Sequence, residues 1–205
     1  MADSHDAESA DGGIYRPLGP NQIRLLTLLP DASDEKSIRC TLEEVSLDRD
    51  EQPFPSYKAL SYTWGSAKDL LDITVNGLPL KATSNLKAAL ENFRDSEYAQ
   101  STITLWVDAI CINQKDAIEK STQVRLMREI FSQAEETWIW LGPEAHGSVN
   151  GIMLIMDLHA TYLQSCQTTD KHRETADKAT WEAIEFDDRL DELVAIDCIF
   201  ARNCE

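Results

Sequence analysis

The stretch Leu105–Gln114 reads LWVDAICINQ and gives the clearest indication of the fold. Its run of Ile, Val and Trp residues predicts a buried strand over 103–107. Asp108 interrupts that run, and a buried strand rarely contains a carboxylate unless the group is paired or lies at the strand end. We therefore expect a strand that ends at a surface and delivers polar side chains there, as the strands of α/β proteins do at their binding sites.

The segments around this stretch alternate between expected strands and expected helices. We expect strands over 23–29, 38–42, 59–62, 73–75, 78–80 and 138–141. We also expect a helix with Ser84 as its N-cap, and helices that begin at Ala117 and near Ile152. Asn76-Gly77 accepts the positive φ angles of a type I′ turn and predicts a hairpin. The first two strands are expected to pair antiparallel. From residue 57 to 164 the alternation predicts parallel strands with right-handed crossovers, and hence an α/β fold with a parallel-sheet core and N-terminal strand additions.

Three polar clusters follow strands of the expected parallel sheet. They are Trp64-Gly65-Ser66, Asp108 with Cys111, Asn113 and Gln114, and Gly142-Pro143-Glu144. Ligands of open parallel sheets bind in the crevice beyond the carboxyl ends of the strands. A glycine after a strand also lets backbone N–H groups approach an anion closely. We therefore expect the three clusters to converge on one edge of the sheet and to form a binding site there.

The charge and composition of the chain disfavour several classes of function. With 19 Lys and Arg against 36 Asp and Glu among 205 residues, the net charge is −17. Binding to nucleic acid or to an anionic membrane surface needs positive potential, so we expect neither. No apolar run approaches the ~20 residues of a membrane span, and the acidic N-terminus lacks a secretory signal. Five irregularly spaced cysteines fit a reduced, cytoplasmic location and predict no metal site.

Each candidate site residue has a structural role as its alternative. Asp108 either positions a ligand hydroxyl or caps the loop that follows the strand. Asn113 and Gln114 either read a ligand through amide hydrogen bonds or close the loop onto the next helix. Glu119 is expected to cap that helix, where the helix dipole favours a carboxylate. Cys111 has no base near it in the sequence and is expected to be a buried structural thiol.

Three segments together resemble the HET (heterokaryon incompatibility) domain of filamentous fungi. They are Tyr57–Gly65 (YKALSYTWG), Leu105–Gln114 (LWVDAICINQ), and the residues from Glu119 through Gln123, Val124, Met127, Ile130 and Ala134 into Trp138–Gly142 (WIWLG). The strands before residue 48 are also typical of what precedes this domain. The resemblance implies three parts: a disordered acidic tail over 1–13, a HET domain over 15–165, and a helical, incomplete C-terminal part of the domain over 166–205.

The resemblance implies a role in fungal self/non-self recognition. HET domains trigger programmed cell death after incompatible hyphae fuse, and we expect this one to act by self-association or with another HET-domain or sensor protein. HET domains are also distantly similar to TIR domains, which have a flavodoxin-like sheet and in some cases cleave NAD. That similarity implies an alternative function as an NAD glycohydrolase, with NAD as the substrate. Its candidate carboxylates are Asp108, Glu144 and Glu205.

The chain departs from the family pattern near residue 205. HET domains usually continue with Trp-Phe-x-Arg-x-Trp-x-x-Gln-Glu, whereas residues 199–205 read IFARNCE. Phe200 and Arg202 match this pattern, and Glu205 lies near its final glutamate but out of register. By analogy with TIR domains, that final glutamate is the catalytic carboxylate. A third alternative is therefore an inactive, truncated HET fragment.

Overall fold

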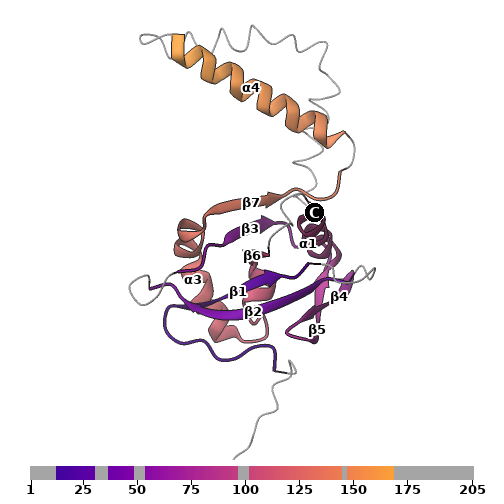
Figure 1. Ribbon diagram of the computed structural model, residues 1–205, viewed down its shortest axis with the longest axis vertical. Helices are drawn as coiled ribbons and strands as arrows, with labels where there is room; N and C mark the ends of the chain where they lie inside the picture. The colour runs from indigo at the N-terminus through magenta and orange to yellow at the C-terminus, as the bar shows by residue number, and fades with distance from the viewer. Residues whose placement is uncertain (1–12, 31–36, 49–53, 97–101, 145–146, 169–205) are drawn as a thin grey trace, which may run out of the picture. The chain divides into compact units, whose positions relative to one another are not determined.

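The computed structural model describes residues 13–30, 37–48, 54–96, 102–144 and 147–168 (Figure 1). Contacts divide the chain into two compact units, Met1–Gly142 and Pro143–Glu205, and each is described by itself. The expected acidic tail, apart from Gly13, lies outside the described residues, as does the helical C-terminal part expected over 166–205 beyond residue 168. The bounds of the three expected parts therefore stay a prediction.

A mixed seven-stranded sheet forms the centre of the first unit (Figure 1). Its strands lie in the order β5-β4-β2-β1-β6-β3-β7. Their bounds are β1 Gln22–Leu28, β2 Arg39–Ser46, β3 Lys58–Tyr62, β4 Leu70–Val75, β5 Leu78–Thr83, β6 Ile103–Trp106 and β7 Glu136–Trp140. Each corresponds to a strand expected from the apolar pattern, with ends that differ by a few residues.

The strand directions confirm the α/β class and the parallel pairing expected among the strands at 59–62, 103–107 and 138–141, within a sheet that is mixed as a whole. β3 runs parallel to both β6 and β7, so the carboxyl ends of these three strands meet at one edge. β1 pairs antiparallel with β2, as expected, and also with β6. The N-terminal strands are thus continuous with the parallel part, and β1 is an inner strand whose side chains are buried along most of its length. The flavodoxin-like arrangement stays a prediction.

The hairpin between β4 and β5 follows from its turn residues. Asn76 and Gly77 have φ angles of 51° and 80°, the left-handed values that a type I′ turn requires. The Asn76 side chain also ties the turn to β2, because its Oδ1 accepts a hydrogen bond from the Leu42 N–H at 3.0 Å. The predicted hairpin is confirmed, and the sheet holds it through a side-chain contact that the turn motif does not reveal.

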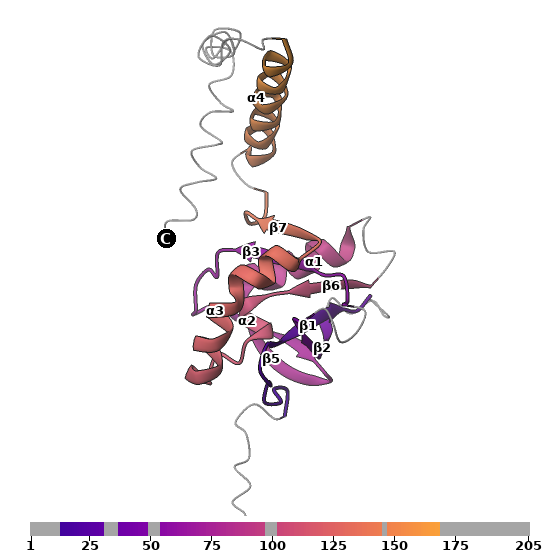
Figure 2. The ribbon, with the colours of Figure 1, turned by 90° about the vertical axis from the view of Figure 1, so that its left-hand side faces the viewer.

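Helices α1 (Ser84–Asp95), α2 (Asp108–Cys111) and α3 (Ala117–Gln133) belong to the first unit, and Figure 2 shows α2 and α3 running beside the sheet. α1 buries Leu86, Ala89 and Leu90, which recur at helical spacing. Its N-cap is Thr83 and not the expected Ser84, because the Thr83 hydroxyl accepts the Leu86 N–H at 3.3 Å. The sequence pattern does not predict α2, since four residues are too few to show a helical period.

The second unit contributes one described helix, α4 (Ser148–Thr168). This helix confirms the one expected near Ile152. Among the described helices, none is long and apolar enough to cross a membrane.

Candidate functional site

The candidate site is organised by α2, which follows β6 after a single residue. Leu105, Trp106 and Val107 are fully buried and anchor this segment in the core. Val107 is still extended, with φ −132°, and the chain then turns into α2. Asp108 is the first residue of that helix and is only partly buried. The buried strand therefore ends at its carboxylate, as the sequence predicts.

Asp108 joins the carboxyl ends of β3 and β6. Its Oδ2 accepts a hydrogen bond from Trp64 Nε1 at 2.9 Å, and its Oδ1 accepts one from the Ala109 N–H at 2.7 Å. Trp64 follows β3, so the first two predicted polar clusters meet in space. The bond from Ala109 is the local capping contact expected as the structural alternative. A ligand-positioning role for Asp108 stays a prediction.

The surroundings of Asp108 have opposing effects on the pKa of its carboxyl group. Burial raises the pKa of this carboxyl above its ordinary value, while the bonds from Trp64 and Ala109 and the charge of Lys120 lower it. Lys120 reaches the same place from α3, with its Nζ 5.9 Å from the centre of the Trp64 ring. The net pKa shift is upward, so desolvation outweighs the three contacts that favour the carboxylate.

Asn85 joins the carboxyl ends of β3 and β7. Its Nδ2 donates to the Thr63 carbonyl at 2.7 Å, and its Oδ1 accepts from Trp140 Nε1 at 2.9 Å. Gly65 lies against it: φ is +72°, and an added Cβ would stand 3.3 Å from the Asn85 Cβ. Both the backbone conformation and the close approach of α1 therefore favour glycine at this turn. Asn85 is a residue of this edge that the sequence analysis did not identify.

Tyr62 places a buried hydroxyl close to Asp108 at the end of β3. Its Oη is shielded from solvent and has no hydrogen-bond partner among the described residues. Burial, followed by the nearby charges of Asp108 and Cys111, raises the pKa of the phenol above its ordinary value. The hydroxyl stays protonated at neutral pH and has one proton to donate.

Cys111 is the buried structural thiol that the sequence predicts. Its Sγ accepts a hydrogen bond from the Val107 N–H at 3.3 Å, which closes the turn of α2. Complete burial raises the pKa of the thiol to about 12. Because the thiolate is the reactive form, this cysteine is a poor nucleophile.

A buried ion pair beneath α2 fixes the loop that follows it. Arg24 of β1 is fully buried and holds the Glu119 carboxylate with two bonds, Nη1 to Oε1 at 2.7 Å and Nη2 to Oε2 at 3.0 Å. Arg24 Nη1 also donates to the Cys111 carbonyl at 3.0 Å, and Nη2 donates to the Arg16 carbonyl at 2.6 Å. Glu119 Oε1 in turn accepts the Asn113 N–H at 2.7 Å. The pair thus connects four segments of the chain.

Glu119 binds Arg24 and does not cap α3, so the role expected for it was wrong. The cap of α3 is Asp116, whose Oδ1 accepts the N–H groups of Ile118 and Glu119 at 2.9 and 3.0 Å. With that end capped, the Glu119 side chain is free to turn inward to Arg24. Arg24 itself is missed by the pattern analysis, although a lone basic residue within the apolar run IRLLTLL is the signal that could have identified it.

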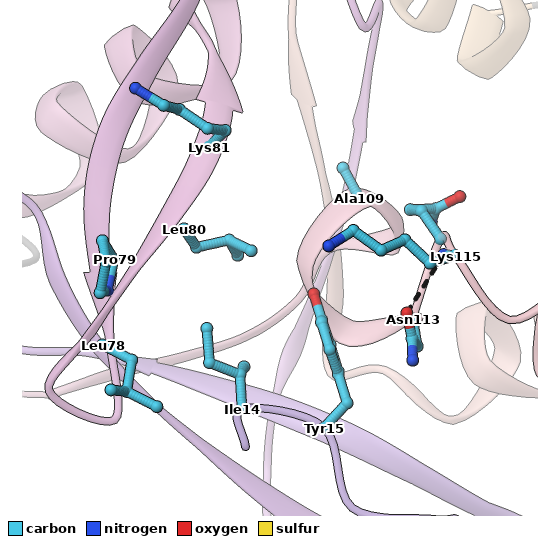
Figure 3. Close-up of a pocket in the computed structure, with 10 residues that line it drawn as sticks. Ile14, Tyr15, Leu78, Pro79, Leu80, Lys81, Ala109, Asn113 and Lys115 are labelled. Atoms are coloured by element: carbon cyan, nitrogen blue, oxygen red, sulfur yellow. Dashed lines mark hydrogen bonds between the residues drawn. The ribbon is translucent and has the colours of Figure 1, made fainter. Parts of the chain in front are cut away.

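A cavity of about 450 Å³ lies between the α2 loop and the β4–β5 hairpin (Figure 3). It is lined by Ile14, Tyr15, Leu78, Pro79, Leu80, Lys81, Ala109, Asn113, Gln114 and Lys115. Figure 3 shows the Leu80 side chain pointing across the cavity from the hairpin, while Lys115 extends toward it from the loop. Two predicted site residues, Asn113 and Gln114, are therefore in the wall of one cavity. Its volume lies in the range of small-molecule sites.

The side chains of Asn113 and Gln114 also make loop-closing contacts. Asn113 Oδ1 accepts the Lys115 N–H at 3.1 Å, and Gln114 Nε2 donates to the Asp108 carbonyl at 2.8 Å. The other end of the Gln114 amide, Oε1, is shielded from solvent without a partner among the described residues. The loop-closing alternative is thus observed, and the ligand-reading alternative stays a prediction.

The remaining predicted site residues are Ser66, Glu144 and Glu205. Ser66 is exposed, and its Oγ accepts the Lys68 N–H at 3.2 Å within its own turn. Glu144 is exposed and belongs to the second unit. Glu205 lies outside the described residues. Within the described part of the chain, no three His, Cys, Asp or Glu side chains come together as a metal site.

Comparisons with known proteins show the family of the chain. Residues 57–196 match the family described as heterokaryon incompatibility protein (HET). Over 180 residues the chain is 34% identical to heterokaryon incompatibility protein 6, OR allele, of Neurospora crassa. That alignment covers 82% of this chain and 26% of the Neurospora protein, so the chain spans about a quarter of its relative. No solved structure matches.

By its fold, the chain is an α/β protein with polar side chains clustered at the carboxyl ends of three parallel strands. Within that class, the chain belongs to the HET (heterokaryon incompatibility) family.

Proposed function

We propose that this chain is a HET module of fungal self/non-self recognition that triggers heterokaryon incompatibility and programmed cell death through self-association. The observation that carries the proposal is the family match over residues 57–196. The name of the Neurospora relative supports the same role. The charge of −17 supports a protein partner over a nucleic acid.

The outer strand β7 is the surface through which we propose that copies associate. β7 pairs with β3 on one side only and ends the strand order of the described sheet. Ile139 on this strand is 68% exposed. A strand with a free edge can add a strand from a second copy, and an exposed apolar side chain strengthens such a contact.

Expression of the full chain in a filamentous fungus, together with light scattering of the purified protein, tests this function. We expect loss of viability and concentration-dependent assembly, both reduced by Ile139→Lys. Ile118→Lys on α3 is the matched control, since Ile118 is 82% exposed but not on the sheet edge. A strict monomer at high concentration that leaves viability unchanged contradicts the proposal.

The domain we propose begins upstream of the matched range, near residue 15. β1 lies between β2 and β6 in the sheet, and Arg24 on β1 binds Glu119 on α3. A segment starting at residue 57 would leave Glu119 without its cation and β6 without its antiparallel neighbour. We therefore expect a fragment over 57–205 to lose its cooperative unfolding transition, while the chain from residue 13 keeps it.

A second proposed function is TIR-like cleavage of NAD, and Asp108 favours it. A carboxylate near the ribose stabilises the oxocarbenium-like transition state as nicotinamide leaves. Asp108 stands at the carboxyl edge of parallel strands beside an exposed tryptophan, Trp64. Incubation of the assembled protein with NAD, followed by detection of nicotinamide, tests this function. Turnover that Asp108→Asn abolishes supports it, and its absence from the folded, assembled protein contradicts it.

A further inference from the structure

We propose that one apolar face of α4 is a further self-association surface, which packs against the same face of α4 in a second copy of the chain. The inference rests on the self-association that we propose as the function, but it uses a surface other than the β7 edge. Three features carry it: the apolar side chains of this face, the burial of the opposite side of the helix, and the absence of charge. The α4 face consists of the side chains of Val149, Ile152, Met153 and Met156.

The α4 face gathers large apolar side chains that are scattered elsewhere on the described surface. Eleven such side chains are exposed among the described residues, and five of them lie on α4 between Val149 and Met156. The other six are spread over four segments of the first unit. The four that make up the α4 face recur at intervals of three and four residues, so they share one side of the helix. Exposed apolar surface that is gathered in one place marks an interaction site.

The opposite side of α4 is already covered within the chain. Leu154 is fully buried, and Gly151 and Leu158, one turn before and one turn after it, are buried and half-buried. The helix is therefore apolar on two sides, of which one is packed and the other is exposed. A helix that is apolar all round is normally buried all round. The α4 face thus calls for a partner that the described residues do not supply.

The charge of the chain favours a second copy as that partner. Two chains that each carry a net charge of −17 repel one another wherever their carboxylates meet. From Val149 to Met156 the helix has no Asp, Glu, Lys or Arg, and its first charged residue, Asp157, comes after the face. Two α4 faces can therefore meet without opposing charges. A basic protein, which the acidic surface would attract, finds no carboxylate on this face to bind.

The size and symmetry of such a pair define what can be measured. The face runs for about two helical turns, or ~11 Å, and buries less than the ~1,200 Å² of a stable interface. We therefore expect association through α4 to be weak and to depend on concentration. In a two-fold pair, a residue in the middle of the face, such as Met153, lies near the same residue of the other copy, and every substitution enters the interface twice.

Sedimentation velocity of the full chain that carries Ile139→Lys tests the contact, because this substitution removes the proposed association through β7. We expect a monomer–dimer equilibrium that Met153→Glu weakens about tenfold or more, since the pair would then bury two facing carboxylates. Asn150→Glu is the matched control: it adds the same charge to the same helix at an exposed residue outside the α4 face, and it should leave the dimer unchanged.

An exchange of charge tests whether the α4 face meets the same face of another copy. In the Ile139→Lys background, Met153→Glu and Met153→Lys should each be monomeric. An equimolar mixture of the two should recover the dimer, because opposite charges then face one another. Circular dichroism and thermal unfolding of each variant as a monomer verify that the substitution acts on association and not on folding.

Four outcomes overturn the proposal. The Ile139→Lys chain stays monomeric at every concentration, Met153→Glu and Asn150→Glu weaken the dimer equally, or the mixture of charged variants stays monomeric. The fourth is a monomer that Met153→Glu, but not Asn150→Glu, destabilises, because the face is then packed inside its own chain.

The unaltered chain separates a failure of this inference from a failure of the proposed function. If it assembles while Ile139→Lys is monomeric, self-association stands and takes place through β7 alone. If both are monomeric, the two proposals fail together. A dimer that Met153→Glu loses, Asn150→Glu keeps and the mixture restores supports the α4 face as an interface between copies.

Discussion

The two walls of the cavity are built by different means. The hairpin wall consists of β4 and β5, which are joined by the two-residue turn Asn76-Gly77 and carry an exposed ion pair, Lys81 with Asp72. The loop wall, 109–115, depends on Arg24 and Glu119, which lie 95 residues apart in the chain. One wall is thus held by neighbours in sequence and the other by a contact between distant segments.

This difference predicts how strongly each wall depends on its ion pair. The exposed ion pair sits in water, so solvent screens its attraction and its loss costs little. The buried pair has already lost its hydration, so removing one partner leaves an uncompensated charge inside the protein. The loop wall, which carries the predicted site residues, should therefore be far more sensitive to charge substitution than the hairpin wall.

The largest effect is expected from Arg24→Met. The substitution leaves Glu119 with a side chain that is 10% exposed and no cation, and it removes the bond to the Cys111 carbonyl. We expect a loss of about 3–5 kcal/mol in the free energy of unfolding, measured by urea denaturation. The double variant Arg24→Met, Glu119→Leu should recover part of this loss. If the single variant unfolds at the wild-type midpoint, the loop wall does not depend on the ion pair.

A smaller effect is expected from Gly77→Ala in the hairpin turn. The φ angle of +80° is strained for a residue with a Cβ, although an added Cβ would contact nothing within 4 Å. The cost is therefore conformational alone, about 1–2 kcal/mol. Gly77→Asn is the control and should lose less, because asparagine tolerates left-handed φ better. Equal losses for Ala and Asn would mean that packing, and not φ, restricts this position.

A pH-dependent effect is expected from Asp108→Asn. Burial raises the carboxyl pKa in the folded state, so the folded protein binds more protons than the unfolded chain just above the unfolded pKa of 3.8. Stability contributed by this group is present at lower pH and is lost as pH rises through the raised pKa. Unfolding free energies measured from pH 4 to 7 should therefore fall for the wild type relative to Asp108→Asn. The effect should be modest, because Trp64, Ala109 and Lys120 oppose the shift. If the difference in unfolding free energy between the wild type and Asp108→Asn does not change with pH, the expected pKa shift is contradicted.

The smallest effect is expected from Lys81→Met, the matched counterpart of Arg24→Met. Lys81 and Asp72 have side chains that are 58% and 66% exposed. We expect at most about 0.5 kcal/mol of lost stability, which disappears at high salt. If Lys81→Met lost as much stability as Arg24→Met, the two walls would not differ in their dependence on charge pairs.

The sequence predicts the elements of the hairpin half well because its signals are local. Asn76-Gly77 encodes its own turn, and the apolar positions of α1 recur at a period that a single helix explains. The antiparallel pair of β1 and β2 also follows from strands that are adjacent in the chain. Such features depend on residues a few positions apart, so the spacing of apolar and turn residues is enough to predict them.

The candidate site is only partly predictable, because several of its contacts join residues that are far apart in the sequence. The pattern of polar residues after buried strands led to Trp64 and Asp108, which the structure joins by a hydrogen bond. It did not lead to Arg24 or Asn85, because each acts through a partner on another element. The antiparallel placement of β1 beside β6 was missed too, since periodicity reveals a strand but not its neighbour.

By itself, then, the sequence determined the α/β class, most helix and strand positions, the hairpin and the HET family, all of which rest on local patterns and quoted motifs. Only the tertiary structure decided that β1 pairs antiparallel with β6, that Glu119 turns inward to Arg24, and that residues 109–115 form one wall of a cavity. The physical reason is that burial, strand neighbours and charge pairs are properties of segments far apart in the chain. Those segments meet only when the whole sheet has formed.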